Sequence, residues 1–258
     1  MKFFDTHCHI HFANYGLPAD DVYQAARDED VPYMLAVGCT IEDSRAGVDF
    51  AAEHEGVWAA VGLHPHEAKH YHGATDVLTE LADLAQRDEV VAIGECGLDY
   101  YYEHSPREQQ IAIFEQQLQI AGDARLPVSF HVRDAFDDFL PIIANFPDVQ
   151  GVVHSFTAGV KVMERLLERG FYLGLNGIMT FTKDEAQLAM ARAVPLEKML
   201  LETDAPFLTP KRFRGSICEP KHVAETGRFL AELRGESVEA IASATTTNAS
   251  RLFAVPKS

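Results

Sequence analysis

The sequence lacks the features that would indicate a secreted, membrane-bound or generally nucleic-acid-binding protein. No stretch approaches the roughly 18 consecutive apolar residues of a membrane helix, and no charged-then-apolar targeting pattern opens the chain. The four cysteines stand far apart without a Cys-x-x-Cys pair, which is typical of reduced thiols. Basic residues are few, since 22 Lys and Arg face 39 Asp and Glu and leave a formal net charge of -17. We therefore expect a cytoplasmic protein that binds neither membranes nor polyanions unselectively.

The pattern of short apolar runs predicts the fold. No linker or low-complexity segment divides the 258 residues, so we expect a single domain over residues 1–258. Eight apolar runs, separated by segments that read as helix or loop, lie at 3–6, 32–37, 57–62, 90–94, 127–130, 151–153, 171–175 and 199–201. Several are apolar throughout, as strands of a buried parallel sheet are. The alternation predicts an α/β fold, a TIM-like (β/α)8 barrel. The alternative, an open doubly wound sheet, lacks its Gly-rich phosphate turn.

One covering helix can be predicted in detail after the fourth run. Ser105 is the expected N-cap, Pro106 the first helical residue, and Glu108 completes a capping box three residues after the serine. Phe114 and Leu118 then fall on one apolar face. We expect this helix to pack on the sheet.

Side chains suited to metal binding or proton transfer stand at the carboxyl ends of nearly all the predicted strands. In a barrel these ends meet at one rim, where the loops form the active site. The opposite strand ends carry nothing comparable. The candidates are His7, His9, His64, Glu95, His131, His154, Asn176 and Asp204. The pattern indicates a reactive site at this rim.

Each candidate also has a structural explanation when taken alone. His7 and His9 alternate along a strand and share one face, where they could bind one metal or form a hydrogen-bonded core pair. His131 and His154 could be buried core histidines. Glu95 could pair with a base, but no Arg or Lys lies within several residues of it. Their shared position at strand ends favours a metal site.

The number of candidate ligands favours two metal ions. Six side chains are more than the three that one tetrahedral zinc uses beside water. Glu95 is the best bridge, because a carboxylate offers two oxygens to two cations, and no lysine stands at a suitable strand end to replace it. We assign His7, His9 and Asp204 to one ion, His131 and His154 to the other, and Glu95 to both. Such ligands suit Zn, Mn, Co or Fe, and Mg less well.

The charge of this site favours an anionic substrate. Two divalent ions (+4) and two ligand carboxylates (-2) leave +2 at the rim of a chain of formal charge -17. Two metals roughly 3.5–4 Å apart can hold phosphodiester oxygens and lower the pKa of a bound water. The sequence therefore predicts phosphoryl hydrolysis by an activated water.

Three residues are candidates for proton transfer. Asp204 could accept the proton of the water, and Glu202 lies two residues earlier on the same strand face as a supporting group. The order of importance of these two stays open. His64 is not needed as a ligand, so it could donate a proton to the substrate or be a solvated loop residue.

Basic and aromatic residues near the rim could contact the substrate. Arg133, Arg212 and Arg214 are the best candidates for binding phosphate, although basic loop residues are often only solvated. Aromatic residues that could stack on bases are Tyr100, Tyr101, Tyr102 and Phe213.

These motifs resemble those of the TatD family of metal-dependent hydrolases. The matching segments are 5–9, 62–65, 94–100, 127–133, 154–157, 202–206, 214–220 and 248–253, in the family's order and spacing. The resemblance implies a barrel of the amidohydrolase type, a divalent-metal site of the six predicted ligands, and His64 near the scissile phosphate. It also implies DNase activity, often 3′ to 5′ on single strands. Cys218 stands where the family usually has Asn, so a loop contact differs.

The resemblance leaves the substrate open. Some relatives are credited with removing D-amino acids from tRNA, an ester hydrolysis that the same metal site could perform. A catalytically inactive barrel that serves as an interaction module is a third hypothesis, and the complete ligand set argues against it. We expect single-stranded DNA or aminoacyl-tRNA as the nucleic-acid partner, and a monomer.

Overall fold

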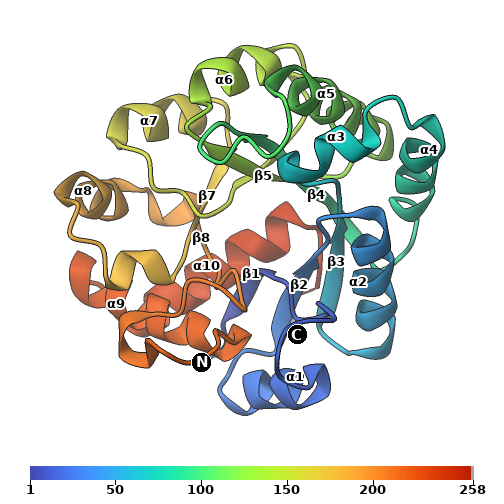
Figure 1. The fold of residues 1–258 in the computed structure, drawn as a ribbon. Helices are drawn as coiled ribbons and strands as arrows, with labels where there is room; N and C mark the ends of the chain where they lie inside the picture. Colours follow the sequence, from blue (N-terminus) through green and yellow to red (C-terminus); the bar gives the residue numbers. More distant parts are fainter. Residues whose placement is uncertain (257–258) are drawn as a thin grey trace. The chain divides into compact units, whose positions relative to one another are not determined.

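The computed structural model describes residues 1–256 and contains one eight-stranded sheet whose strand order follows the sequence. The strands are β1 (Phe4–Cys8), β2 (Tyr33–Val37), β3 (Val57–Val61), β4 (Val90–Asp99), β5 (Val128–Arg133), β6 (Gly151–Val153), β7 (Tyr172–Leu175) and β8 (Met199–Leu201). A parallel bridge between Cys8 and Ala205 joins the end of β1 to the chain beyond β8. The predicted TIM-like (β/α)8 barrel is confirmed (Figure 1).

Helices follow the strands along the chain. They are α1 (Ala19–Asp28), α2 (Ile41–Glu53), α3 (Ala68–Tyr71), α4 (Thr75–Leu84), α5 (Arg107–Ala124), α6 (Phe136–Ala144), α7 (Val160–Glu168), α8 (Glu185–Ala193), α9 (Val223–Arg234) and α10 (Val238–Leu252). None of the helices within residues 1–256 combines the length and apolar character of a membrane span. The chain forms two compact units, of which the first combines Met1–Leu35 with the chain from His154 onward and the second is Ala36–Val153. The single domain over 1–258 stays a prediction.

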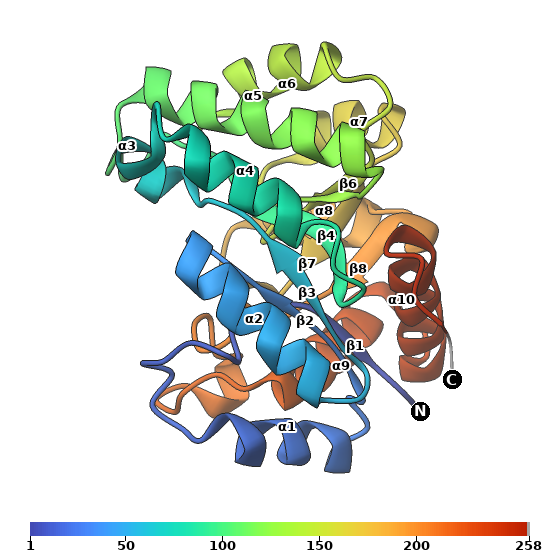
Figure 2. The same ribbon diagram turned by 90° about the vertical axis from the view of Figure 1, so that its right-hand side faces the viewer.

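In the first unit, α9 and α10 pack beside β1 and β8 (Figure 2). Gly227 of α9 lies so close to the Phe3 ring that an added methyl group would overlap it. Asn248 of α10 donates hydrogen bonds to the carbonyls of Leu196 and Met199 at 2.8 and 2.9 Å. The terminal helices therefore fix the strands that carry part of the site.

In the second unit, α5 packs on β4 and α6 on β5 (Figure 1). Phe114, on the predicted apolar face of α5, lies 6.1 Å from the Phe130 ring. The predicted capping box is wrong, because α5 begins at Arg107 without a side-chain cap. The Ser105 hydroxyl instead donates to the His66 carbonyl at 2.7 Å and accepts from the Lys69 N–H at 3.0 Å. The Ser105 hydroxyl therefore forms tertiary hydrogen bonds in place of the helix cap that the local sequence predicted.

Strands β4 and β5 continue beyond their predicted ends at 94 and 130, so Glu95 and His131 lie inside strands. Gly97, with φ +147°, approaches the His131 carbonyl so closely that no side chain would fit there. The register pairs Gly97 with His131 and Asp99 with Arg133. The extension therefore brings Asp99 beside a predicted ligand.

Candidate metal centre

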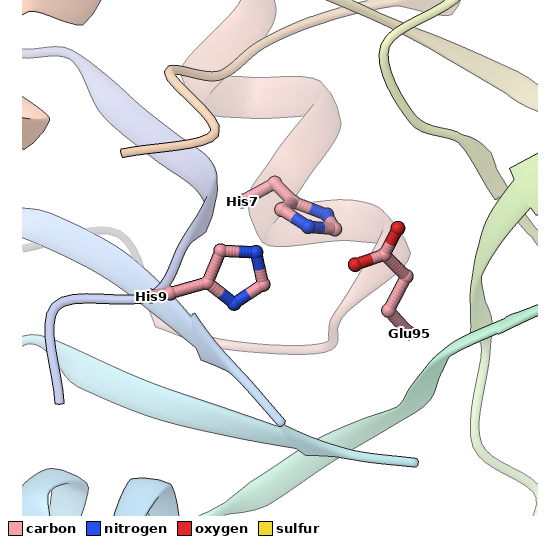
Figure 3. A group of neighbouring side chains, drawn as sticks. All are labelled: His7, His9 and Glu95. Carbon is pink, nitrogen blue, oxygen red and sulfur yellow. The ribbon is translucent and has the colours of Figure 1, made fainter. Parts of the chain in front are cut away.

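The backbone of the first unit brings His7 and His9 beside Asp204. The Asp204 N–H donates to the His7 carbonyl at 2.8 Å, and the His9 N–H donates to the Ala205 carbonyl at 2.7 Å. Asp204 Oδ1 lies 3.6 Å from His7 Nε2 and 3.4 Å from His9 Nε2. Figure 3 shows both imidazole rings extending from the β1 segment. The three ligands assigned to one ion therefore lie together.

Buried Asp5 supports this pairing and was not singled out in the sequence. Its carboxylate accepts hydrogen bonds from the Thr203 N–H at 2.9 Å, the Thr203 hydroxyl at 2.5 Å and the His7 N–H at 3.3 Å. Asp204 follows with φ +61°, a left-handed conformation that Asp tolerates better than most residues. Asp5 thus ties β1 to the turn that presents Asp204.

Asp204 is held in its ionised form. Burial alone would raise the pKa of Asp204, but the hydrogen bond with His9 and the nearby rings of His154 and His7 lower it below its ordinary value. An ionised carboxylate with several acceptor positions is a suitable ligand for a divalent cation.

His154 and Glu202 complete the cluster of the first unit. The His7 and His154 rings stack with centroids 3.9 Å apart. Glu202 is fully buried, and its Oε1 accepts from the Ser155 N–H at 2.5 Å and the Asn176 amide at 3.2 Å. One donor atom each of His7, His154 and Glu202 lies within 4.8 Å of the others. Glu202 Oε2 has no hydrogen-bond partner among residues 1–256, so a cation suits this position.

The second unit brings together Glu95, His131 and His64. His131 Nδ1 lies 2.7 Å from Glu95 Oε1, and His64 Nε2 lies 3.3 Å from His131 Nδ1 and 3.5 Å from Glu95 Oε1. Glu95, drawn in Figure 3, is buried and extends from β4. One ligand atom of each residue lies within 4.8 Å of the others. His64, which the sequence placed outside the ligand set, therefore lies within this cluster.

Asp99 is the residue of this cluster that sequence reasoning missed. Its Oδ2 lies 2.9 Å from His131 Nε2 and 3.0 Å from His66 Nε2. Burial alone would raise the pKa of Asp99, but the hydrogen bonds with His131 and His66 lower it well below its ordinary value. The His66 side chain is only 25% exposed because it reaches this carboxylate. The sequence feature that could have identified Asp99 is its spacing from Glu95, because residues four apart lie on the same face of an extended strand.

His64 is neutral in this environment. Burial lowers the pKa of His64 to about 4. Its Nδ1 accepts a hydrogen bond from the His66 N–H at 3.1 Å, so the single proton resides on Nε2. Gln117 of α5 fixes the preceding residue, since its side chain accepts from the Leu63 N–H at 2.8 Å and donates to the Leu63 carbonyl at 3.0 Å. His64 can thus donate a hydrogen bond from a fixed position.

The three predicted phosphate-binding arginines have different surroundings. Arg212 lies 3.4 Å from Glu225, and Arg214 lies over the Phe181 ring. Arg133, at the end of β5, is exposed and forms no ion pair within the described chain. Of the three, only Arg212 lies beside a carboxylate among the described residues.

Cys218 lies inside the loop that follows the site. It is fully buried, its carbonyl accepts from the Tyr15 hydroxyl at 2.6 Å, and its N–H donates to the Pro206 carbonyl at 3.1 Å. Burial raises the pKa of the Cys218 thiol above its ordinary value. The position therefore packs the loop rather than meeting solvent.

A (β/α)8 barrel with histidine and carboxylate clusters on its strands defines a metal-dependent hydrolase. The sequence model of the family described as TatD related DNase matches residues 4–254. YcfH of Escherichia coli K12, named an uncharacterized metal-dependent hydrolase, is 36% identical over 263 residues, which cover 100% of this chain and 98% of YcfH. This chain belongs to the TatD family of metal-dependent hydrolases.

Two further proteins are similar to this chain, one in sequence and one in structure. The 3′-5′ ssDNA/RNA exonuclease TatD of Escherichia coli K12 is 32% identical over 98% of this chain and 99% of its own length. The crystal structure of YjjV, a TatD homologue from Escherichia coli K12, superposes with a TM-score of 0.92 at 29% identity, covering 98% of each chain. The expected fold type and enzyme class are confirmed.

Proposed function

We propose that this protein is a nuclease that removes nucleotides from the 3′ end of single-stranded DNA. The observation that carries the proposal is the set of histidine and carboxylate donors on β1, β4 and β5 and beyond β6 and β8, all of them buried or half-buried. The relationship to a 3′-5′ exonuclease over 98% of the chain supports this choice of substrate. We keep the cytoplasmic location and the monomeric state as predictions.

The proposed cofactor is a pair of divalent metal ions. His7, His9 and Asp204 would hold one ion, His131 and His154 the other, and Glu95 would bind both. The donor set fits such ions, since it combines the ionised Asp204 carboxylate with imidazoles. The neighbouring Glu202 Oε2, buried and without a hydrogen-bond partner within residues 1–256, also suits a nearby cation. Bound divalent ions supply Lewis acidity toward the phosphate and toward water.

The residues around the proposed ions have separable roles. Asp204, ionised by its histidine neighbours, accepts the proton of the attacking water. Glu202 holds the backbone next to His154 by accepting the Ser155 N–H, and the Asn176 amide holds Glu202 in place. His64 donates a hydrogen bond from Nε2 to a substrate oxygen. The bond from phosphorus to the leaving 3′ oxygen breaks as the water oxygen bonds to phosphorus, and the leaving 3′ oxygen takes up a proton from solvent.

Phosphate contacts farther along the strand would come from the basic side chains. Arg133, Arg212 and Arg214 are the proposed contacts, and their guanidinium groups suit phosphate oxygens. Because the whole chain is strongly acidic, binding would depend on these few local charges.

The test is hydrolysis of a 5′-labelled single-stranded oligonucleotide with added Zn, Mn, Co, Fe or Mg, followed on a denaturing gel. We expect progressive shortening from the 3′ end, which chelation stops and Asp204→Asn lowers by at least ~100-fold. Intact oligonucleotide with every metal would contradict the proposal. Release of a D-amino acid from charged tRNA, with the RNA intact, would instead support the alternative ester hydrolysis.

A further inference from the structure

Two exposed tyrosines and an arginine stand together at the carboxyl ends of β4 and β5. Tyr101 and Tyr102 are 59% and 50% exposed, and their rings meet edge to face with centroids 4.8 Å apart. The Arg133 guanidinium lies over both rings, 4.1 Å from the Tyr101 centroid and 4.8 Å from the Tyr102 centroid. We propose that these residues form a stacking subsite for an unpaired nucleobase of the substrate. This inference rests on the nuclease function proposed above.

A shared carboxylate fixes this group relative to the candidate metal ligands. Asp99 Oδ1 accepts hydrogen bonds from the Tyr101 N–H at 3.0 Å and the Tyr102 N–H at 2.9 Å. Its Oδ2 lies 2.9 Å from His131 Nε2. Arg133 follows His131 by two residues on β5. A strand whose phosphate reaches His131 would therefore pass the tyrosines.

The two rings have different surroundings. The Tyr102 ring already contacts two histidine rings. It lies parallel to the His104 ring at 5.6 Å and edge-on to the His66 ring at 5.6 Å. Tyr101 contacts the Arg133 guanidinium on one face, and more than half of the residue stays exposed. Tyr101 is thus the more open of the two rings for stacking, and Tyr102 lies beside it.

The charge around the tyrosines matches a nucleotide. Arg133 forms no ion pair in the part of the chain that the structure describes, whereas Arg107, over the neighbouring Tyr100 ring, lies 2.6 Å from Glu103. Arg133 therefore keeps its charge for a phosphate next to the stacked base. Stacking accepts any base, because every base has a π-face, and duplex DNA hides those faces. The subsite would select single strands without selecting sequence.

The test is binding of the metal-loaded enzyme to a fluorescein-labelled single-stranded oligonucleotide, measured by anisotropy. Its 3′-terminal linkages are phosphorothioates that slow hydrolysis, and a gel checks that the oligonucleotide stays intact. We expect Tyr101→Ala to raise Kd ~5–150-fold and Tyr101→Phe to leave it within ~3-fold, because the phenyl ring keeps its stacking face. On a matched oligonucleotide of abasic residues, Tyr101→Ala should have no effect.

Arg133→Ala and Arg107→Ala form a matched pair in the same assay. We expect Arg133→Ala to raise Kd. The slope of log Kd against log salt should fall by about 1, the change expected for the loss of one phosphate contact, while Arg107→Ala changes neither quantity. Unchanged binding by Tyr101→Ala, or an equal loss on the abasic strand, would overturn the subsite. Failure of the wild-type enzyme to shorten DNA would overturn the proposed nuclease function without altering this binding result.

Discussion

Asp99 connects the tyrosine turn to the ring of His131, and this gives it a positioning role. With a cation bound at His131 Nδ1, 2.7 Å from Glu95, the ring would carry its proton on Nε2, where Asp99 Oδ2 is an acceptor at 2.9 Å. Asp99→Asn would turn an amide N–H toward Nε2 and favour the other tautomer. We expect a 10–100-fold loss of metal affinity in a folded protein, measured by chelator competition.

The control for this change is Asp138→Asn. Asp138 accepts a hydrogen bond from the Tyr100 hydroxyl at 2.8 Å, and it is exposed. The same loss of charge at this position should leave the metal affinity unaltered. Equal affinities of wild type and Asp99→Asn would show that Asp99 does not select the tautomer of His131.

His222 should make stability depend on pH. Burial lowers the pKa of His222, whose Nδ1 accepts from the Glu219 N–H at 3.1 Å and whose ring stacks on Phe213 at 4.4 Å. The unfolded chain therefore binds a proton, near its ordinary pKa of ~6.5, more readily than the folded one. Stability falls as the pH drops below that value and is unaffected by this group above it.

His222→Gln should remove this part of the pH dependence. The free energies of unfolding of the variant and the wild type are measured in urea at a fixed metal concentration. We expect the difference, variant minus wild type, to be more positive at pH 5.5 than at pH 7.5. A relative stability that is constant between these pH values would mean that the protonation of His222 is not linked to folding.

At the scale of elements, Gly174 of β7 makes room for a functional side chain. A methyl group at this position would overlap the Glu202 carboxylate and displace it from Ser155 and Asn176. We expect Gly174→Ala to lower the free energy of unfolding by ~1–3 kcal/mol, measured in urea, and to reduce hydrolysis. The control is Gly122→Ala in α5, where a methyl group meets no atom within 4 Å. That change should raise the free energy of unfolding by ~1 kcal/mol, because alanine favours the helix. An equal decrease in the free energy of unfolding for both variants would show that overlap with Glu202 is not the cause.

The sequence predicted the elements better than their ends. All eight apolar runs became strands, because burial on both faces leaves a strong hydrophobic signal. The extension of β4 to Asp99 depends on the close approach of Gly97 to β5. A pattern of neighbouring residues gives no information on that contact, so the end of the strand could not be predicted. Likewise Gln110 and Gln117 of α5 use their buried amides to hold the backbone of Asp99 and Leu63. Their partners lie 11 and 54 residues away, beyond the reach of a local pattern, so the fold identifies them.

At the scale of the whole molecule, topology explains why the candidate ligands could be found. The carboxyl ends of parallel strands in sequential order meet at one edge of the sheet. The candidate ligands from His7 to Asp204 could therefore be assigned to one site before any interatomic distance was known. The partners within each group could not be predicted in this way. The proximity of His64 to Glu95 and the buried position of Glu202 depend on side-chain packing, which strand order does not determine.

Removal of the proposed metals should destabilise the whole chain. Carboxylates at Glu95, Glu202 and Asp204 are largely withdrawn from water, and without cations the loss of their hydration opposes folding. A metal present at 100 times its Kd stabilises the native state by ~2.7 kcal/mol, or ~5–10 °C in Tm at this chain length. Calorimetry of the chelated protein, titrated with Zn or Mn, should show this rise. NaCl at the same ionic strength serves as the control, because a full recovery of Tm with NaCl would assign the effect to screening of the acidic surface instead of to ions held by these ligands.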